Sequence, residues 1–294
     1  MPDAQRLRPP SHKTTTPPAR LADLSATRKH LTKCSHGEKD LPYITGNTPD
    51  VERYARYVIS PTGRPWLDEL AAAAELFVTV LVSAEHQKGA LSSPVRACPG
   101  WTLRDLAVHL GQTHRWTVGM LDGADPRQRP PIRPAEGERL SDWYYAESET
   151  LRKALAVAGP DAPCWTLVKE QRTALFWQRR QVHETVIHLW DAHQALGGSI
   201  DLDPILAFDG LEEVRDVMYP RMLRAERVEP LAQNLVLSAS DLHSESVVIG
   251  DAEQSAHVQG PAADLLLLVW QRIPWRPVFG DAAAEELVAQ SLVP

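Results

Sequence analysis

The sequence has few cysteines, only three among 294 residues. Three thiols cannot form the disulfide framework of a small secreted protein, so we expect a reducing compartment. No run of about 18 apolar residues is present, which excludes a transmembrane helix, and the first residues lack the apolar segment of a signal peptide. The formal net charge of −7 argues against a nucleic-acid binder. We therefore expect a cytoplasmic protein with neither a nucleic-acid nor a membrane partner.

Charge and composition set the first part of the chain apart from the rest. Residues 1–60 carry ten lysines and arginines against six aspartates and glutamates, and they contain Pro9-Pro10 and Pro17-Pro18. Such a segment buries too little apolar surface to offset its chain entropy. We interpret it as a mostly disordered extension, with a basic interaction arm as the alternative.

Helical patterns dominate the next part of the chain. Apolar residues recur at helical spacing after Pro65, Thr102 and Asp105 resemble a capping box, and glycines follow two of the apolar stretches. The expected helices span residues 66–85, 103–121, 138–158 and 174–196. Helices of this length in one segment predict an up-and-down four-helix bundle over residues 65–198.

The pattern changes after Gly198. Asp203-Pro204 is expected to open a helix to about Tyr219, and short β-like runs follow at residues 234–239 and 246–249. A final apolar helix is expected over residues 262–272. Short strands mixed with helices predict a separate α+β domain over residues 203–290, so the whole chain is expected to be mainly α.

One group of residues has the chemistry of a metal site. Glu184 and His188 are four residues apart in a predicted helix and therefore lie one turn apart on the same face. A third ligand would have to come from another helix, and His109 in the apolar 103–121 segment is the natural candidate. A solvated Glu–His pair and a core histidine remain open as alternatives, because both are common in helices.

Two segments resemble the signatures of a known family. Residues 97–116 contain Cys-Pro-Gly-Trp-Thr-Leu-Arg-Asp and His109, and residues 179–192 contain Arg-Arg-x-x-His-Glu-x-x-x-His-x-Trp-Asp-Ala. Both resemble the mycothiol-dependent maleylpyruvate isomerase family, which is actinobacterial and belongs to the DinB/YfiT-like metal-binding four-helix bundles. Residues 260–272 resemble the small α+β C-terminal domain of that family. The resemblance covers about residues 65–290.

The resemblance implies a metal centre formed by His109, Glu184 and His188. Two imidazoles and one carboxylate with open positions suit catalytic Zn²⁺, although non-haem iron or nickel would also fit. Asp191 is then a candidate for orienting a ligand imidazole, with a surface carboxylate as the alternative.

Other positions bear on the substrate and the thiol. Arginines that could contact an anionic substrate or cofactor, or simply be solvated, are Arg115, Arg179 and Arg180. Cys98 is interpreted as a structural thiol rather than a nucleophile. Family members often have arginine where this chain has Leu189, and its absence could remove a contact to an acidic substrate, or could be a surface change.

The resemblance thus implies an enzyme that uses a divalent metal and mycothiol, a low-molecular-weight thiol, as a transferase or isomerase of a small electrophilic substrate. A non-catalytic metal-binding sensor or interaction module on the same fold is the alternative, and a vestigial site that only packs the bundle is a third. The sequence is compatible with a monomer or a homodimer.

Overall fold

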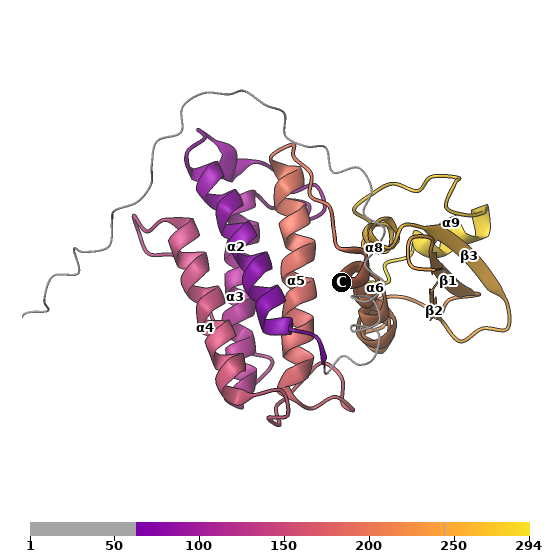
Figure 1. Ribbon diagram of the computed structural model, residues 1–294, viewed down its shortest axis with the longest axis horizontal. Coiled ribbons are helices and arrows are strands. Elements are labelled where there is room, and N and C mark those ends of the chain that lie inside the picture. The colour runs from indigo at the N-terminus through magenta and orange to yellow at the C-terminus, as the bar shows by residue number, and fades with distance from the viewer. Residues whose placement is uncertain (1–62, 244) are drawn as a thin grey trace, which may run out of the picture. The chain divides into compact units, whose positions relative to one another are not determined.

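Local signals in the sequence set the helix boundaries in the computed structural model, which describes residues 63–243 and 245–294. The first helices are α2 (Trp66–Glu85), α3 (Leu103–Leu121), α4 (Leu140–Ala158) and α5 (Ala174–Ala195), and Figure 1 shows them side by side. All described residues belong to one compact unit. The predictions for residues 1–60 lie outside the described residues.

Capping residues explain where the helices begin and end. The Thr102 hydroxyl accepts a hydrogen bond from the Asp105 amide, and the Asp105 carboxylate accepts one from the Thr102 amide, so the predicted capping box is present. At the C-terminal ends of α4 and α5, Gly159 and Gly197 have φ angles of +75°. Glycine adopts this left-handed conformation without a steric cost, which lets the chain leave the helix there.

The four-helix bundle and the mainly helical fold are confirmed. Within the bundle, α3 and α4 run parallel, since Gly111 meets Trp143 and Arg115 pairs with Glu147 further along both helices. The directions of successive helices therefore do not alternate strictly. In an up-and-down bundle they would. The reason is the connection of residues 122–139, which returns to the end of the bundle where α2 ends, so that Glu85 accepts a hydrogen bond from the amide of Ser141.

The chain after α5 forms helices around a small sheet. The elements are α6 (Pro204–Glu213), the π-helical turn η3 (Val214–Met218), α7 (Tyr219–Arg224), β1 (Asn234–Ala239), β2 (Ser246–Ile249), β3 (Ser255–Gly260), α8 (Ala262–Val269) and α9 (Ala282–Val288). In the strand order β2-β1-β3, β1 pairs antiparallel with β2 and parallel with β3. This small α+β arrangement follows the bundle as predicted.

Several details of this C-terminal region differ from the sequence-based expectations. The strand β3 and the helix α9 were not predicted, and the expected 262–272 helix ends at Val269. The strand β3 was missed because only Ala256 and Val258 alternate with polar residues before the glycine.

No helix of the described residues is long and apolar enough to cross a membrane.

Candidate metal centre

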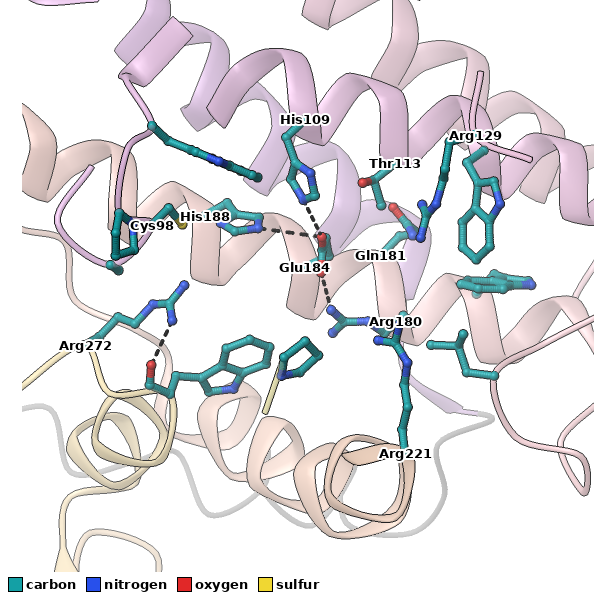
Figure 2. Close-up of a pocket in the computed structure, with 18 residues that line it drawn as sticks. Cys98, His109, Thr113, Arg129, Arg180, Gln181, Glu184, His188, Arg221 and Arg272 are labelled. Atoms are coloured by element: carbon teal, nitrogen blue, oxygen red, sulfur yellow. Dashed lines mark hydrogen bonds and ion pairs between the residues drawn. The ribbon is translucent and has the colours of Figure 1, made fainter. Parts of the chain in front are cut away.

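The antiparallel helices α3 and α5 bring three of the predicted site residues together. His109 Nε2 lies 3.3 Å from Glu184 Oε1, and His188 Nε2 lies 3.6 Å from the same oxygen. One ligand atom from each of these residues lies within 4.8 Å of the others. Figure 2 shows the two imidazoles and the carboxylate converging on one point of a cavity.

The environment keeps the Glu184 carboxylate charged. Burial opposes the charge, but the Arg180 guanidinium and hydrogen bonds from His109 and His188 outweigh it, so the pKa of Glu184 lies well below its usual range. The His109 side chain is 36% exposed, and its ring packs against the Trp101 ring with the centroids 4.8 Å apart. One face of the histidine is thus supported while its Nε2 points at the carboxylate.

A second layer of contacts orients His188. Its Nδ1 lies 3.0 Å from Asp191 Oδ2, which leaves Nε2 turned toward Glu184. Asp191 accepts two further hydrogen bonds from Arg272, of 3.0 Å and 2.9 Å. Burial disfavours the charged imidazole, but the hydrogen bonds to Asp191 and Glu184 raise the pKa of His188 to about 9. Asp191 thus contacts a candidate ligand, and its role in orienting a metal-bound imidazole stays a prediction.

The other oxygen of Glu184 is occupied as well. Arg180 donates to Glu184 Oε2 with one terminal nitrogen and to Glu213 Oε2, at 2.7 Å, with the other. Glu213 lies on α6, so a residue of the C-terminal region holds an arginine of the bundle.

A cavity of about 440 Å³ opens beside these residues. Indole rings form much of its apolar wall, from Trp101, Trp116, Trp177 and Trp270. Arginines from separate segments supply positive charge, namely Arg129, Arg180, Arg221 and Arg272. The cavity thus combines a carboxylate–imidazole cluster with a cationic and aromatic lining.

Two of these arginines have no carboxylate partner among the residues that the structure describes. The guanidinium carbon of Arg129 lies 3.8 Å from the centroid of the Trp116 ring. Burial lowers the pKa of both Arg129 and Arg221, and the nearby Arg180 charge lowers that of Arg221 further. Both nevertheless remain cations at neutral pH, so this part of the cavity carries two positive charges without a direct ion-pair partner in the described part of the chain, partly offset by the Glu184 carboxylate.

The three arginines predicted as anion contacts have different surroundings. Only Arg180 lines the cavity. Arg115 forms a two-point ion pair with Glu147, and Arg179 pairs with Asp209 at 2.8 Å. Leu189 is buried in the bundle core and does not line the cavity.

Cys98 lies at the edge of the cavity near His188 and Asp191. Burial, and then the negative charge of Asp191, raise the pKa of its thiol to about 11. A thiol with this pKa is protonated at neutral pH and is a poor nucleophile, and the structural role of Cys98 stays a prediction.

Sequence reasoning did not identify Arg129, Arg221 or Arg272 as residues of the cavity. They come from the connection after α3, from α7 and from the segment after α8. No local motif surrounds them, so only the tertiary arrangement reveals their shared location. The resemblance of residues 260–272 to a family signature was the one available hint for Arg272.

The residues present fit a divalent cation. Two imidazole nitrogens and one carboxylate oxygen converge, and the second nitrogen of His188 is hydrogen-bonded to a carboxylate, as is usual for histidines that ligate metals. The adjoining cavity leaves room for further ligands, as in catalytic rather than structural sites.

Comparisons with known proteins agree with this architecture. The mycothiol maleylpyruvate isomerase N-terminal domain matches residues 67–193, and the C-terminal domain of the same family matches residues 206–286. The chain therefore belongs to the mycothiol-dependent maleylpyruvate isomerase family.

Individual relatives are more distant. Uncharacterized proteins from two strains of Mycobacterium tuberculosis are each 25% identical over 153 residues, which is 51% of this chain and 77% of the relative. The crystal structure of the mycothiol-dependent maleylpyruvate isomerase superposes with a TM-score of 0.51 at 15% identity, covering 71% of this chain and 90% of that one. A point mutant of that enzyme gives the same TM-score at 14% identity. At this level of identity the structures show a shared fold.

Proposed function

We propose that this protein is a metal- and mycothiol-dependent transferase or isomerase that acts on a small electrophilic substrate. The observation that carries the proposal is the convergence of His109, Glu184 and His188 at the wall of a cavity large enough for a small ligand. Zn²⁺ is the cation that this donor set favours, and iron or nickel would also fit.

The chemistry follows from the donors and the lining. When bound, a divalent cation would lower the pKa of a thiol that coordinates it and so make a thiolate available at neutral pH. The thiol sulfur would add to an electrophilic carbon of the substrate, giving transfer if it stays and isomerisation if it leaves after bond rotation. The indole rings of the cavity would give the substrate an apolar surface to pack against.

Arg129 and Arg221, which have no direct ion-pair partner among the described residues, favour an anionic substrate. Arg129 and Arg221 present guanidinium groups that match a carboxylate in shape and charge. The arginine that many family members have at position 189 is not needed for this, because Leu189 lies outside the cavity lining.

The proposal is tested by elemental analysis of the purified full-length chain together with titration of mycothiol. We expect a molar ratio of metal to chain close to one in the wild type. His109→Ala should weaken metal binding by more than about 100-fold, because losing a direct ligand costs more than losing an outer residue. His86→Ala is the matched control, since this histidine is exposed on the C-terminal side of α2.

The outcomes separate the candidate functions. Metal binding without any interaction with mycothiol would contradict the thiol-dependent enzyme and favour a metal-binding sensor or interaction module. No metal in either the wild type or His109→Ala, with loss of stability in the variant, would indicate a site that only packs the bundle.

A further inference from the structure

The side chain of Glu184 is held so that its two oxygens have different roles. Oε1 faces both imidazoles, at 3.3 Å from His109 Nε2 and 3.6 Å from His188 Nε2. Oε2 points the other way and accepts a hydrogen bond from Arg180. Figure 2 shows the guanidinium on the side of the carboxylate opposite the histidines.

Arg180 cannot easily leave this position. Its side chain is 8% exposed and its second terminal nitrogen is held by Glu213, which is 2% exposed. Arg180 lies on α5 and Glu213 on α6, so the contact ties the carboxylate of the bundle to the C-terminal region. Because Glu213 is buried and Glu184 is only 13% exposed, swinging the guanidinium into another rotamer would leave poorly solvated charges unpaired.

From this geometry we infer that Arg180 and Glu213 are positioning residues that restrict Glu184 to a single ligand oxygen. This inference rests on the proposed metal centre. With Oε2 engaged by Arg180, the cation is left with one carboxylate oxygen and two imidazole nitrogens from the protein. The remaining coordination positions are then available to the thiol and the substrate.

Glu213 has a separate effect through its charge. Arg180, Glu184 and Glu213 together carry one net negative charge when all are ionised, which favours a nearby cation. Neutralising Glu213 removes that excess and leaves the guanidinium with Glu184 as its sole charged partner. The affinity for the cation should then fall while the number of protein ligand atoms stays the same.

The experiment uses Co²⁺ as the probe, in the full-length protein freed of metal. The visible absorption of Co²⁺ weakens as its ligand atoms increase in number, so the spectrum reports coordination geometry. Replacing both members of the pair, Arg180→Met with Glu213→Leu, avoids leaving Glu213 as an unpaired buried charge and frees Oε2. Glu184 keeps its contacts with His109 and His188. We expect a weaker Co²⁺ absorption than in the wild type, because Glu184 can then bind through both oxygens.

The isosteric variant Glu213→Gln tests the charge effect and should fold even if the double variant does not. We expect its Co²⁺ dissociation constant to rise roughly 10-fold, the lower end of the range for outer-shell residues, with absorption intensity unchanged. The control is Arg115→Met with Glu147→Leu, a two-point pair in the same bundle that does not line the cavity. It should leave both readouts as in the wild type.

The results distinguish the two levels of the proposal. A wild-type protein that binds no Co²⁺ would overturn the metal centre itself. If the wild type binds Co²⁺ but Glu213→Gln binds it equally well and the folded double variant keeps the wild-type absorption, the positioning role is wrong and the metal centre stands. A double variant that changes the spectrum no more than the Arg115–Glu147 control would likewise contradict the inference.

Discussion

At the scale of single residues, His114 shows how the bundle carries a polar group close to the candidate metal centre. The imidazole is fully buried, its Nδ1 donates to Gln181 Oε1 at 2.9 Å, and its Nε2 lies 3.3 Å from the Tyr144 hydroxyl. Gln181 in turn donates to Thr117. In this network the neutral imidazole uses both nitrogens, Nδ1 as a donor to Gln181 and Nε2 as an acceptor from the Tyr144 hydroxyl.

The burial of His114 predicts a pH dependence of stability. Burial lowers the pKa of His114 to about 4 in the folded protein, against about 6.5 when unfolded. Between these pH values the unfolded chain therefore binds more protons than the folded protein. The stability that depends on a neutral His114 is fully present above pH 6.5 and is lost as the pH falls toward 4. The loss amounts to about 3 kcal/mol of the unfolding free energy.

Urea unfolding at pH 7 and pH 4.5 measures this effect. We expect His114→Gln to have a shallower pH dependence than the wild type, because the variant lacks the group that titrates only when unfolded. The exposed His86→Gln variant should keep the wild-type dependence. Equal slopes for wild type and His114→Gln would show that other groups dominate.

The residue scale also shows how far the sequence could predict the site. The i, i+4 spacing of Glu184 and His188, with the family resemblance, identified the three residues whose ligand atoms the structure places within 4.8 Å. The partners of those residues were harder to find. Glu213 and Arg272 lie 29 and 84 positions after Glu184 and His188, and nothing in the sequence indicates which buried arginine meets which carboxylate.

At the scale of elements, the helices whose ends carry local chemistry were the most predictable. The capping box at Thr102 and the glycines after α4 and α5 mark boundaries through contacts within a few residues. The parallel direction of α3 and α4 has no such local marker, since it depends on the path of the 122–139 connection. The strand β3 has only two apolar residues that alternate with polar ones, and no local signal indicates its parallel pairing with β1.

The packing of α3 against α4 depends on a glycine. A Cβ at Gly111 would lie 2.5 Å from Cη2 of Trp143, whose ring is buried. Alanine normally favours a helix interior by about 1 kcal/mol over glycine. Here we expect Gly111→Ala to destabilise instead, because overpacking costs about 1–3 kcal/mol.

A double-mutant cycle with Trp143→Phe separates these effects, measured as unfolding free energies in urea. Phenylalanine lacks the distal ring atoms that the new methyl group would meet. In the Trp143→Phe background, Gly111→Ala should therefore be neutral or stabilising. A destabilisation of the same size in both backgrounds would mean that the contact with Trp143 is not the cause.

At the scale of the whole described unit, buried ion pairs link the bundle to the C-terminal region. Arg179 pairs with Asp209, Arg180 pairs with Glu213, and Asp191 pairs with Arg272. The first two join α5 to α6, and the third joins α5 to the segment after α8. Two of the three pairs include a residue that contacts a candidate ligand. Arg180 contacts Glu184, and Asp191 contacts His188. The C-terminal region thus supports the geometry of the candidate centre as well as one wall of its cavity.

The Asp191–Arg272 pair gives the sharpest test of this link. The Asp191 side chain is 0% exposed and that of Arg272 is 8% exposed, so Arg272→Met would leave a buried carboxylate without its arginine. We expect a loss of about 3–5 kcal/mol in the free energy of unfolding. The matched control is Arg276→Met, which removes an exposed pair with Asp264 and should cost less than about 1 kcal/mol. Urea titrations of both variants measure the difference, and raising the salt concentration should weaken the control pair more than the buried one. Equal losses in the two variants would mean that Asp191 finds water or another partner when Arg272 is removed, and that the C-terminal region does not hold this carboxylate in place.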